Sequence, residues 1–167
     1  MEITSDIILR GTAWNKAIES LGTIFKTRTN YSLYILALSI GIMYDKRIEK
    51  PNENGEEYKP SVPRNVIQNN DGGKLEFMFQ ASILTTRTEN LTEDERLELA
   101  FGEKTNFKKI DFLTQFANFG VTKLVECIGI TPLESMENLK KFLFSIEKEK
   151  NFDIEPLIEE ISISEYN

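Results

Sequence analysis

The sequence predicts an all-α protein, an irregular helical bundle of six to seven helices with one long polar loop. In several long segments the apolar residues recur at steps of three and four, which is the spacing of one helix face. Thr92 and Thr131 are each followed three positions later by Glu, which is the capping-box pattern of a helix start. No internal repeat of fixed period is present, so the pattern favours an irregular bundle over an α-solenoid.

The length and composition fit one globular domain with a short tail. The chain has 167 residues, of which 40% are hydrophobic and 28% are charged. This content is sufficient for a core and excludes global disorder. We assign residues 1–150 to a single helical domain and residues 151–167 to an acidic, hydrophobic C-terminal tail. The single cysteine, Cys127, lies in an apolar run, which predicts a buried and unreactive thiol.

Six segments show helical spacing, and they cover residues 13–25, 31–44, 74–87, 92–102, 107–128 and 131–150. Segment 31–44 is apolar on most faces and predicts a central buried helix, although its Ile and Tyr residues also suit a strand. Gly120 is expected to divide segment 107–128 into two helices. The apolar residues of the last segment are expected inside the bundle, and they are Leu133, Met136, Leu139, Leu143 and Ile146.

The connections between these segments are polar and rich in helix-breaking residues. The first dozen residues, which include Ile7 and Ile8, predict either a short strand or a docking arm. Residues 45–65 contain three prolines and an Asn-Gly pair, which predicts the long polar loop. Residues 66–68 are expected to form one turn, and Asp71 is expected to cap the helix that follows it.

The charge distribution argues against nucleic-acid binding. The net charge is −7, from 20 basic and 27 acidic residues. Residues 1–50 carry seven basic and five acidic residues, a net of +2, whereas residues 90–167 carry nine and sixteen, a net of −7. Cations that neutralise phosphates supply most non-specific affinity for nucleic acids. We therefore expect no tight nucleic-acid binding by the isolated chain at physiological salt.

The chain contains no histidine, which removes several kinds of catalytic and metal site. Ser-His-Asp and Cys-His catalysis and two-His zinc sites are excluded. A carboxylate-based, metal-dependent nuclease survives this argument, and its nearest candidate string is Glu147-Lys148-Glu149-Lys150. Alternating charges at a helix end are usually a solvated face. No glycine-rich loop provides a phosphate site. The sequence therefore predicts a protein that is not an enzyme and that uses no cofactor or metal.

Two segments are candidate partner-binding sites. The first is a basic cluster around the long loop, formed by Lys46, Arg47, Lys50, Lys59 and Arg64. It predicts contact with phosphate or an acidic protein face, or else only solvated loop charges. The second is the tail, where acidic residues alternate with apolar ones that suit a groove on this domain or on a neighbour. The tail residues concerned are Phe152, Ile154, Leu157, Ile158 and Ile161.

The sequence carries no recognisable targeting or membrane-spanning segment. Its N-terminus lacks the basic start and long apolar run of a signal peptide. Its most apolar stretch, residues 34–44, is about half as long as a membrane-spanning helix. We expect a cytoplasmic protein without membrane contact.

One resemblance supplies a specific functional expectation. Residues 32–42 are an apolar run that ends in Gly and Ile and is followed by Lys46-Arg47. Val62-Pro63 and the later run Phe116-Ala117-Asn118-Phe119-Gly120 complete the pattern. This arrangement resembles the small helical proteins encoded beside bacterial DNA phosphorothioation (Dnd-type) restriction genes, over roughly residues 30–128. The long loop, Asp45 within the basic cluster and the acidic tail depart from it.

The resemblance implies a non-catalytic accessory subunit of a prokaryotic anti-phage defence system. Such a subunit would act through protein–protein contacts, with an ATPase or nuclease subunit of the same system as its partner. A homo-oligomer is also compatible with the sequence. Two alternatives remain, a DNA-contacting or transcriptional module that uses the basic loop and a carboxylate-based metal-dependent nuclease.

Overall fold

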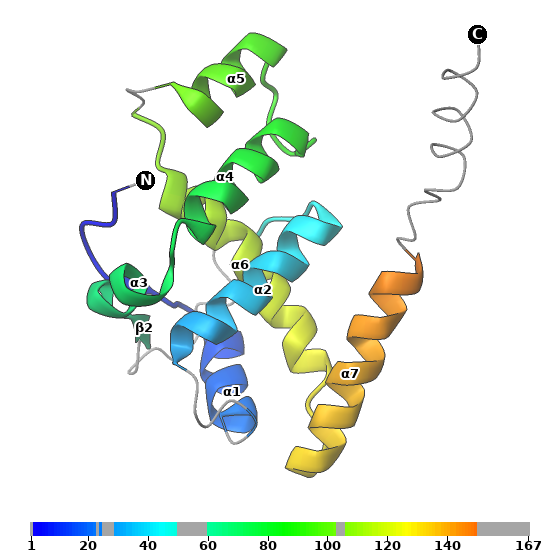
Figure 1. The fold of residues 1–167 in the computed structure, drawn as a ribbon. Coiled ribbons are helices and arrows are strands. Elements are labelled where there is room, and N and C mark those ends of the chain that lie inside the picture. The colour runs from blue at the N-terminus through cyan, green and yellow to red at the C-terminus, as the bar shows by residue number, and fades with distance from the viewer. Residues whose placement is uncertain (1, 23, 25–28, 50–59, 103–105, 150–167) are drawn as a thin grey trace, which may run out of the picture.

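The computed structural model describes residues 2–22, 24, 29–49, 60–102 and 106–149. This part of the chain folds into seven helices and one two-stranded sheet, which confirms the predicted all-α fold (Figure 1). The elements are β1 (Ile7–Ile8), α1 (Thr12–Leu21), α2 (Asn30–Tyr44), β2 (Ser61–Val62), α3 (Arg64–Asn70), α4 (Lys74–Thr85), α5 (Glu93–Phe101), α6 (Lys109–Glu126) and α7 (Pro132–Glu149).

Helices α2 and α6 form the centre of the molecule and cross at two glycines. A Cβ atom on Gly41 of α2 would overlap the carbonyl oxygen of Phe116. A Cβ atom on Gly120 of α6 would overlap the carbonyl oxygen of Ala37. The prediction that Gly120 divides this segment was wrong, since α6 continues through it to Glu126. The glycine is needed for the close approach of two backbones, and packing outweighs its low helix propensity.

Helix α2 is buried as predicted, and a polar link joins it with α1 and α6. Tyr34 is fully buried and stacks on the fully buried Trp14 of α1, with ring centres 6.3 Å apart. The Trp14 Nε1–H group donates to Asn118 Oδ1 of α6 at 2.9 Å. Asn118 in turn donates to the carbonyl oxygens of Ile48 and Glu49, at 3.1 and 3.2 Å. One buried amide therefore ties three parts of the chain together.

The N-terminal segment forms a strand, which resolves the choice between strand and docking arm. β1 pairs antiparallel with β2, with Ile7 opposite Val62 and Ile8 opposite Ser61. The prediction of an uninterrupted loop over residues 45–65 was therefore wrong at β2, because the partner strand lies far away in sequence. Helix α3 follows at once and is longer than the single turn predicted. Residues 50–59 of the predicted loop lie outside the described residues.

Local capping patterns were predicted at the starts of α4, α5 and α7, and they form to different extents. The Thr92–Glu95 capping box of α5 is complete. The Asp71 carboxylate accepts from the backbone N–H of Gly73 and Leu75 and from the Tyr31 hydroxyl, so it pairs N–H groups at the start of α4 and links α4 to α2, although Gly73 occupies the N-cap position. At Thr131 only half of the box forms, since the Glu134 side chain accepts from Ile130 N rather than from Thr131. Helix α1 ends at Leu21, four residues earlier than predicted.

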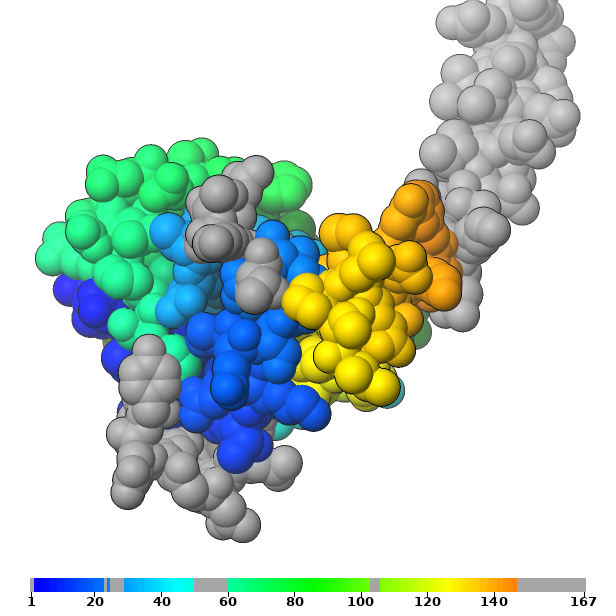
Figure 2. Space-filling model, turned by 90° about the horizontal axis from the view of Figure 1, so that it is seen from below, coloured from blue at the N-terminus to red at the C-terminus, as the bar shows by residue number. Residues whose placement is uncertain are grey.

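Helix α7 lies at one edge of the molecule, after the C-terminal end of α6 and beside α1 (Figures 1 and 2). Figure 2 shows it in yellow and orange next to the blue surface of α1. None of the described helices is both long enough and apolar enough to cross a membrane.

Candidate protein-interaction site

Helix α7 uses one face to join the body of the protein. Ser135, Leu139 and Ile146 are buried, and Phe142 packs against the core from a half-buried position. The Ser135 hydroxyl accepts from Gly129 N at 2.9 Å and donates to Thr131 O at 3.0 Å. These residues recur at steps of four, three and four, which places them on one side of the helix.

A second apolar face of α7 is exposed. Leu133, Met136, Leu143 and Phe144 are 61%, 48%, 38% and 52% exposed, and we call these four residues the α7 stripe. At 100° per residue their centre lies about 120° around the helix from the inner face. The prediction that Leu133, Met136 and Leu143 lie inside the bundle was therefore wrong. An exposed row of large apolar side chains on one helix face is typical of a protein-contact surface.

The α7 stripe encloses a shallow hollow. A concavity of about 390 Å³ is lined by Met136, Leu139, Lys140, Leu143 and Phe144. The Lys140 ammonium lies 5.8 Å from the centre of the Phe144 ring, so its aliphatic stem covers part of the apolar surface. The spacing of the first four lining residues, i, i+3, i+4 and i+7, is that of the holes that receive side chains in paired helices.

Charges on α7 are divided along its length. Glu134 and Glu137 lie in the first two turns, whereas Lys140 and Lys141 lie near the middle, and all four residues are exposed. Among the described residues, Glu137, Lys140 and Lys141 take part in no ion pair.

The predicted basic cluster is not one patch in the structure. Lys46 and Arg47 follow the C-terminal end of α2. Arg64 begins α3, next to Ser61, whose carbonyl accepts a hydrogen bond from Asn30 at the N-terminal end of α2. The two groups thus lie near opposite ends of a 15-residue helix, which is about 21 Å long.

Arg47 makes its contacts within the chain. Its guanidinium pairs with Glu89 at 2.7 Å and donates to Gln115 Oε1 at 3.1 Å and Thr88 O at 2.9 Å. It also lies over the Phe112 ring, 5.0 Å from the centre, and its side chain is only 16% exposed. Lys46 and Arg64 are exposed. These two predicted cations keep a surface position, and Lys50 and Lys59 lie outside the described residues.

We expect Arg47→Met to lower the free energy of unfolding by about 2 kcal/mol, because it leaves the half-buried Glu89 without its charged donor. Arg64→Met, on an exposed side chain, should change it by less than about 0.5 kcal/mol. Urea unfolding of the two variants checks this difference. Equal stability of both variants would show that the Arg47 contacts are unimportant for the fold.

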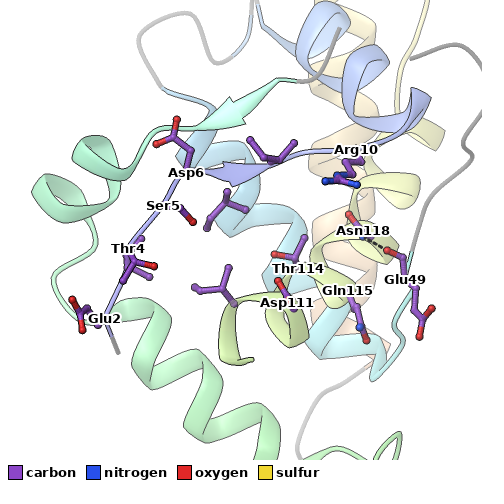
Figure 3. Close-up of a pocket in the computed structure, with 14 residues that line it drawn as sticks. Glu2, Thr4, Ser5, Asp6, Arg10, Glu49, Asp111, Thr114, Gln115 and Asn118 are labelled. Atoms are coloured by element: carbon purple, nitrogen blue, oxygen red, sulfur yellow. Dashed lines mark hydrogen bonds between the residues drawn. The ribbon is translucent and has the colours of Figure 1, made fainter. Parts of the chain in front are cut away.

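A polar groove lies between the N-terminal segment and α6 (Figure 3). Its volume is about 530 Å³, and its carboxylates outnumber its cations, with Glu2, Asp6, Glu49 and Asp111 against Arg10. Figure 3 shows these four carboxylates at separate parts of the groove rather than converging. Asp6 already accepts a hydrogen bond from Arg64 N at 2.8 Å. Within the described residues no three or more Cys, Asp and Glu side chains gather as metal ligands would.

Cys127 is buried, as predicted from its apolar surroundings. Burial raises the pKa of its thiol, and the nearby Glu126 carboxylate acts in the same direction. A thiol with a raised pKa is a poor nucleophile near neutral pH. The predicted tail residues Phe152, Ile154, Leu157, Ile158 and Ile161 lie outside the described residues.

The described residues define an all-α protein of seven helices whose last helix carries an exposed apolar stripe. The chain matches no protein-family model, no curated protein and no solved structure.

The sequence contains a signal for the α7 stripe that the prediction of a single buried face does not include. Segment 131–150 has apolar residues both at Leu139, Phe142 and Ile146 and at Leu133, Met136, Leu143 and Phe144. Together they cover more of the helix than a single buried face requires. Sequence alone does not say which of the two faces meets the core.

Proposed function

We propose that this protein is a non-catalytic interaction subunit that acts through protein–protein contacts of helix α7. The observation that carries the proposal is the α7 stripe, four large apolar side chains exposed on a helix at the edge of the fold. Isolated exposed apolar residues are common on protein surfaces, but four large ones on one side of a single helix suit a helix-in-groove or helix–helix contact.

The biological setting of that contact is proposed from the sequence. The resemblance to helical accessory proteins of phosphorothioation-linked restriction systems supports a role in a prokaryotic defence complex. Within such a complex an ATPase or nuclease subunit would supply the chemistry, and this chain would supply a binding surface.

The test is co-purification of the tagged chain with its partner from native extract. We expect Met136→Asp/Phe144→Asp to reduce partner recovery at least tenfold, because each substitution places a carboxylate in the apolar contact. Both residues are exposed, so the fold should be retained. The proposal fails if this variant recovers the same proteins in the same amounts as the wild type.

A matched control is available on another part of the surface. Phe77 of α4 and Phe101 of α5 are 68% and 62% exposed, and Phe77→Asp/Phe101→Asp makes the same chemical change there. Partner recovery should be unchanged in this control. Loss of the partner in the control but not in the α7 variant would place the contact on α4 and α5 instead.

DNA contact is the second candidate function, and the exposed cations Lys46 and Arg64 favour it. Their separation along α2 and the internal contacts of Arg47 make it the weaker candidate. A carboxylate-based nuclease is the third candidate and no observation favours it, since the side chains of its candidate string, Glu147-Lys148-Glu149-Lys150, lie outside the described part of the structure.

A further inference from the structure

We propose that the partner of the α7 stripe is a second copy of this chain, with the two α7 helices packed antiparallel about a twofold axis near residue 138. This inference rests on the proposed function, since it names the occupant of the same surface.

A twofold interface needs a surface that is complementary to itself. If residue i of one copy meets residue j of the other, then j must also meet i. In an antiparallel pair centred near residue 138, Leu133 faces Leu143 of the second copy, and Met136 faces Lys140. Each apolar residue of the α7 stripe then meets an apolar residue or the aliphatic stem of a lysine.

The charges select the antiparallel orientation. In this register Glu137 of each copy lies beside Lys140 and Lys141 of the other, so the contact gains two symmetry-related sets of opposite-charge pairs near the twofold axis. A parallel pair in register would place Glu137 beside Glu137 and Lys140 beside Lys140. Opposite charges beside an apolar seam set orientation in paired helices, and like charges oppose it.

The hollow on α7 fits the same register. It is bounded by Met136, Leu139, Lys140 and Leu143, whose centre lies near residue 140. The residue opposite that centre in the second copy is Met136. A flexible methionine side chain is well suited to fill a shallow and irregular hollow. Each copy would insert one Met136 into the hollow of the other.

The expected affinity is modest. The α7 stripe spans 12 residues from Leu133 to Phe144, which is about 17 Å of helix. An interface of this extent belongs to the small, transient class, so we expect a dissociation constant on the order of 10 µM. The apparent mass in solution should therefore rise with protein concentration.

The test uses two charge-reversal variants of the full-length chain in analytical ultracentrifugation. The first is Glu137→Lys, and the second is Lys140→Glu/Lys141→Glu. Each variant places like charges opposite each other in its own dimer, so each alone should be monomeric at concentrations where the wild type dimerises. When the two are mixed, every one of these pairs becomes attractive, and dimers should return. Glu98→Lys, an exposed reversal on α5, is the matched control and should dimerise like the wild type.

Three outcomes would overturn the proposal. A wild type that stays monomeric at about 100 µM, ten times the expected dissociation constant, has no such interface. Two monomeric variants that fail to associate when mixed would exclude the antiparallel register. A wild type that dimerises only after removal of residues 152–167 would assign the α7 stripe to the chain's own tail. The wild type could stay monomeric while Met136→Asp/Phe144→Asp still loses a partner from extract. That result would exclude a second copy as the partner but would leave the proposed function standing.

Discussion

Gly120→Ala is expected to destabilise the protein by about 3 kcal/mol, because the added methyl group would overlap the Ala37 carbonyl where α2 and α6 cross. The two helices would have to separate, and the tightly packed side chains around the crossing would lose contacts. Thermal unfolding should show a loss of about 10 °C in Tm for a domain of this size.

The sign of this change separates packing from helix propensity. Alanine is a better helix former than glycine by about 1 kcal/mol, so propensity alone predicts stabilisation at position 120. Gly41→Ala tests the same crossing from the other helix, because its methyl group would overlap the Phe116 carbonyl. A raised Tm in either variant would contradict the close crossing of α2 and α6.

Asn118→Leu is expected to cost about 3 kcal/mol, although leucine has a similar size and is more apolar. The change leaves the buried Trp14 Nε1–H group and the carbonyl oxygens of Ile48 and Glu49 without their partner. Each buried polar group that loses its hydrogen bond costs roughly 1–3 kcal/mol. Urea unfolding with an unchanged m value would measure the loss.

A double-mutant cycle with Trp14→Phe isolates the side-chain hydrogen bond. Trp14→Phe removes the Nε1–H donor and should cost stability on its own, since Trp14 is fully buried. In the Asn118→Leu background the same change should cost about 1 kcal/mol less, because the donor is already unpaired there. Strictly additive effects would mean that the Trp14–Asn118 bond contributes nothing to stability.

Much of the fold follows from local patterns. The helical spacing of segment 31–44 and the box at Thr92 predicted α2 and the start of α5 because both signals act over one or two turns. Asp71 was predicted to cap α4 for the same reason. The absence of histidine excluded whole kinds of catalytic site from composition alone.

Two of the errors depend on a contact between residues far apart in sequence. Gly120 was expected to break a helix. Instead it lies inside α6 and allows α6 to approach α2 closely, because a Cβ atom at this position would overlap the Ala37 carbonyl. Arg47 was expected at the surface, but Glu89 and Gln115 hold it within the fold.

The sequence by itself determined the all-α fold and the buried thiol. Only the tertiary structure decided which face of α7 is free. Leu139 belongs to the buried core and Phe142 packs against it, whereas Met136 and Phe144 on the other face are exposed. The physical reason is that hydrophobic periodicity reports how much of a helix surface is apolar, not which apolar face the rest of the chain covers. The choice between burial in the same chain and burial in a partner depends on where the rest of the fold lies.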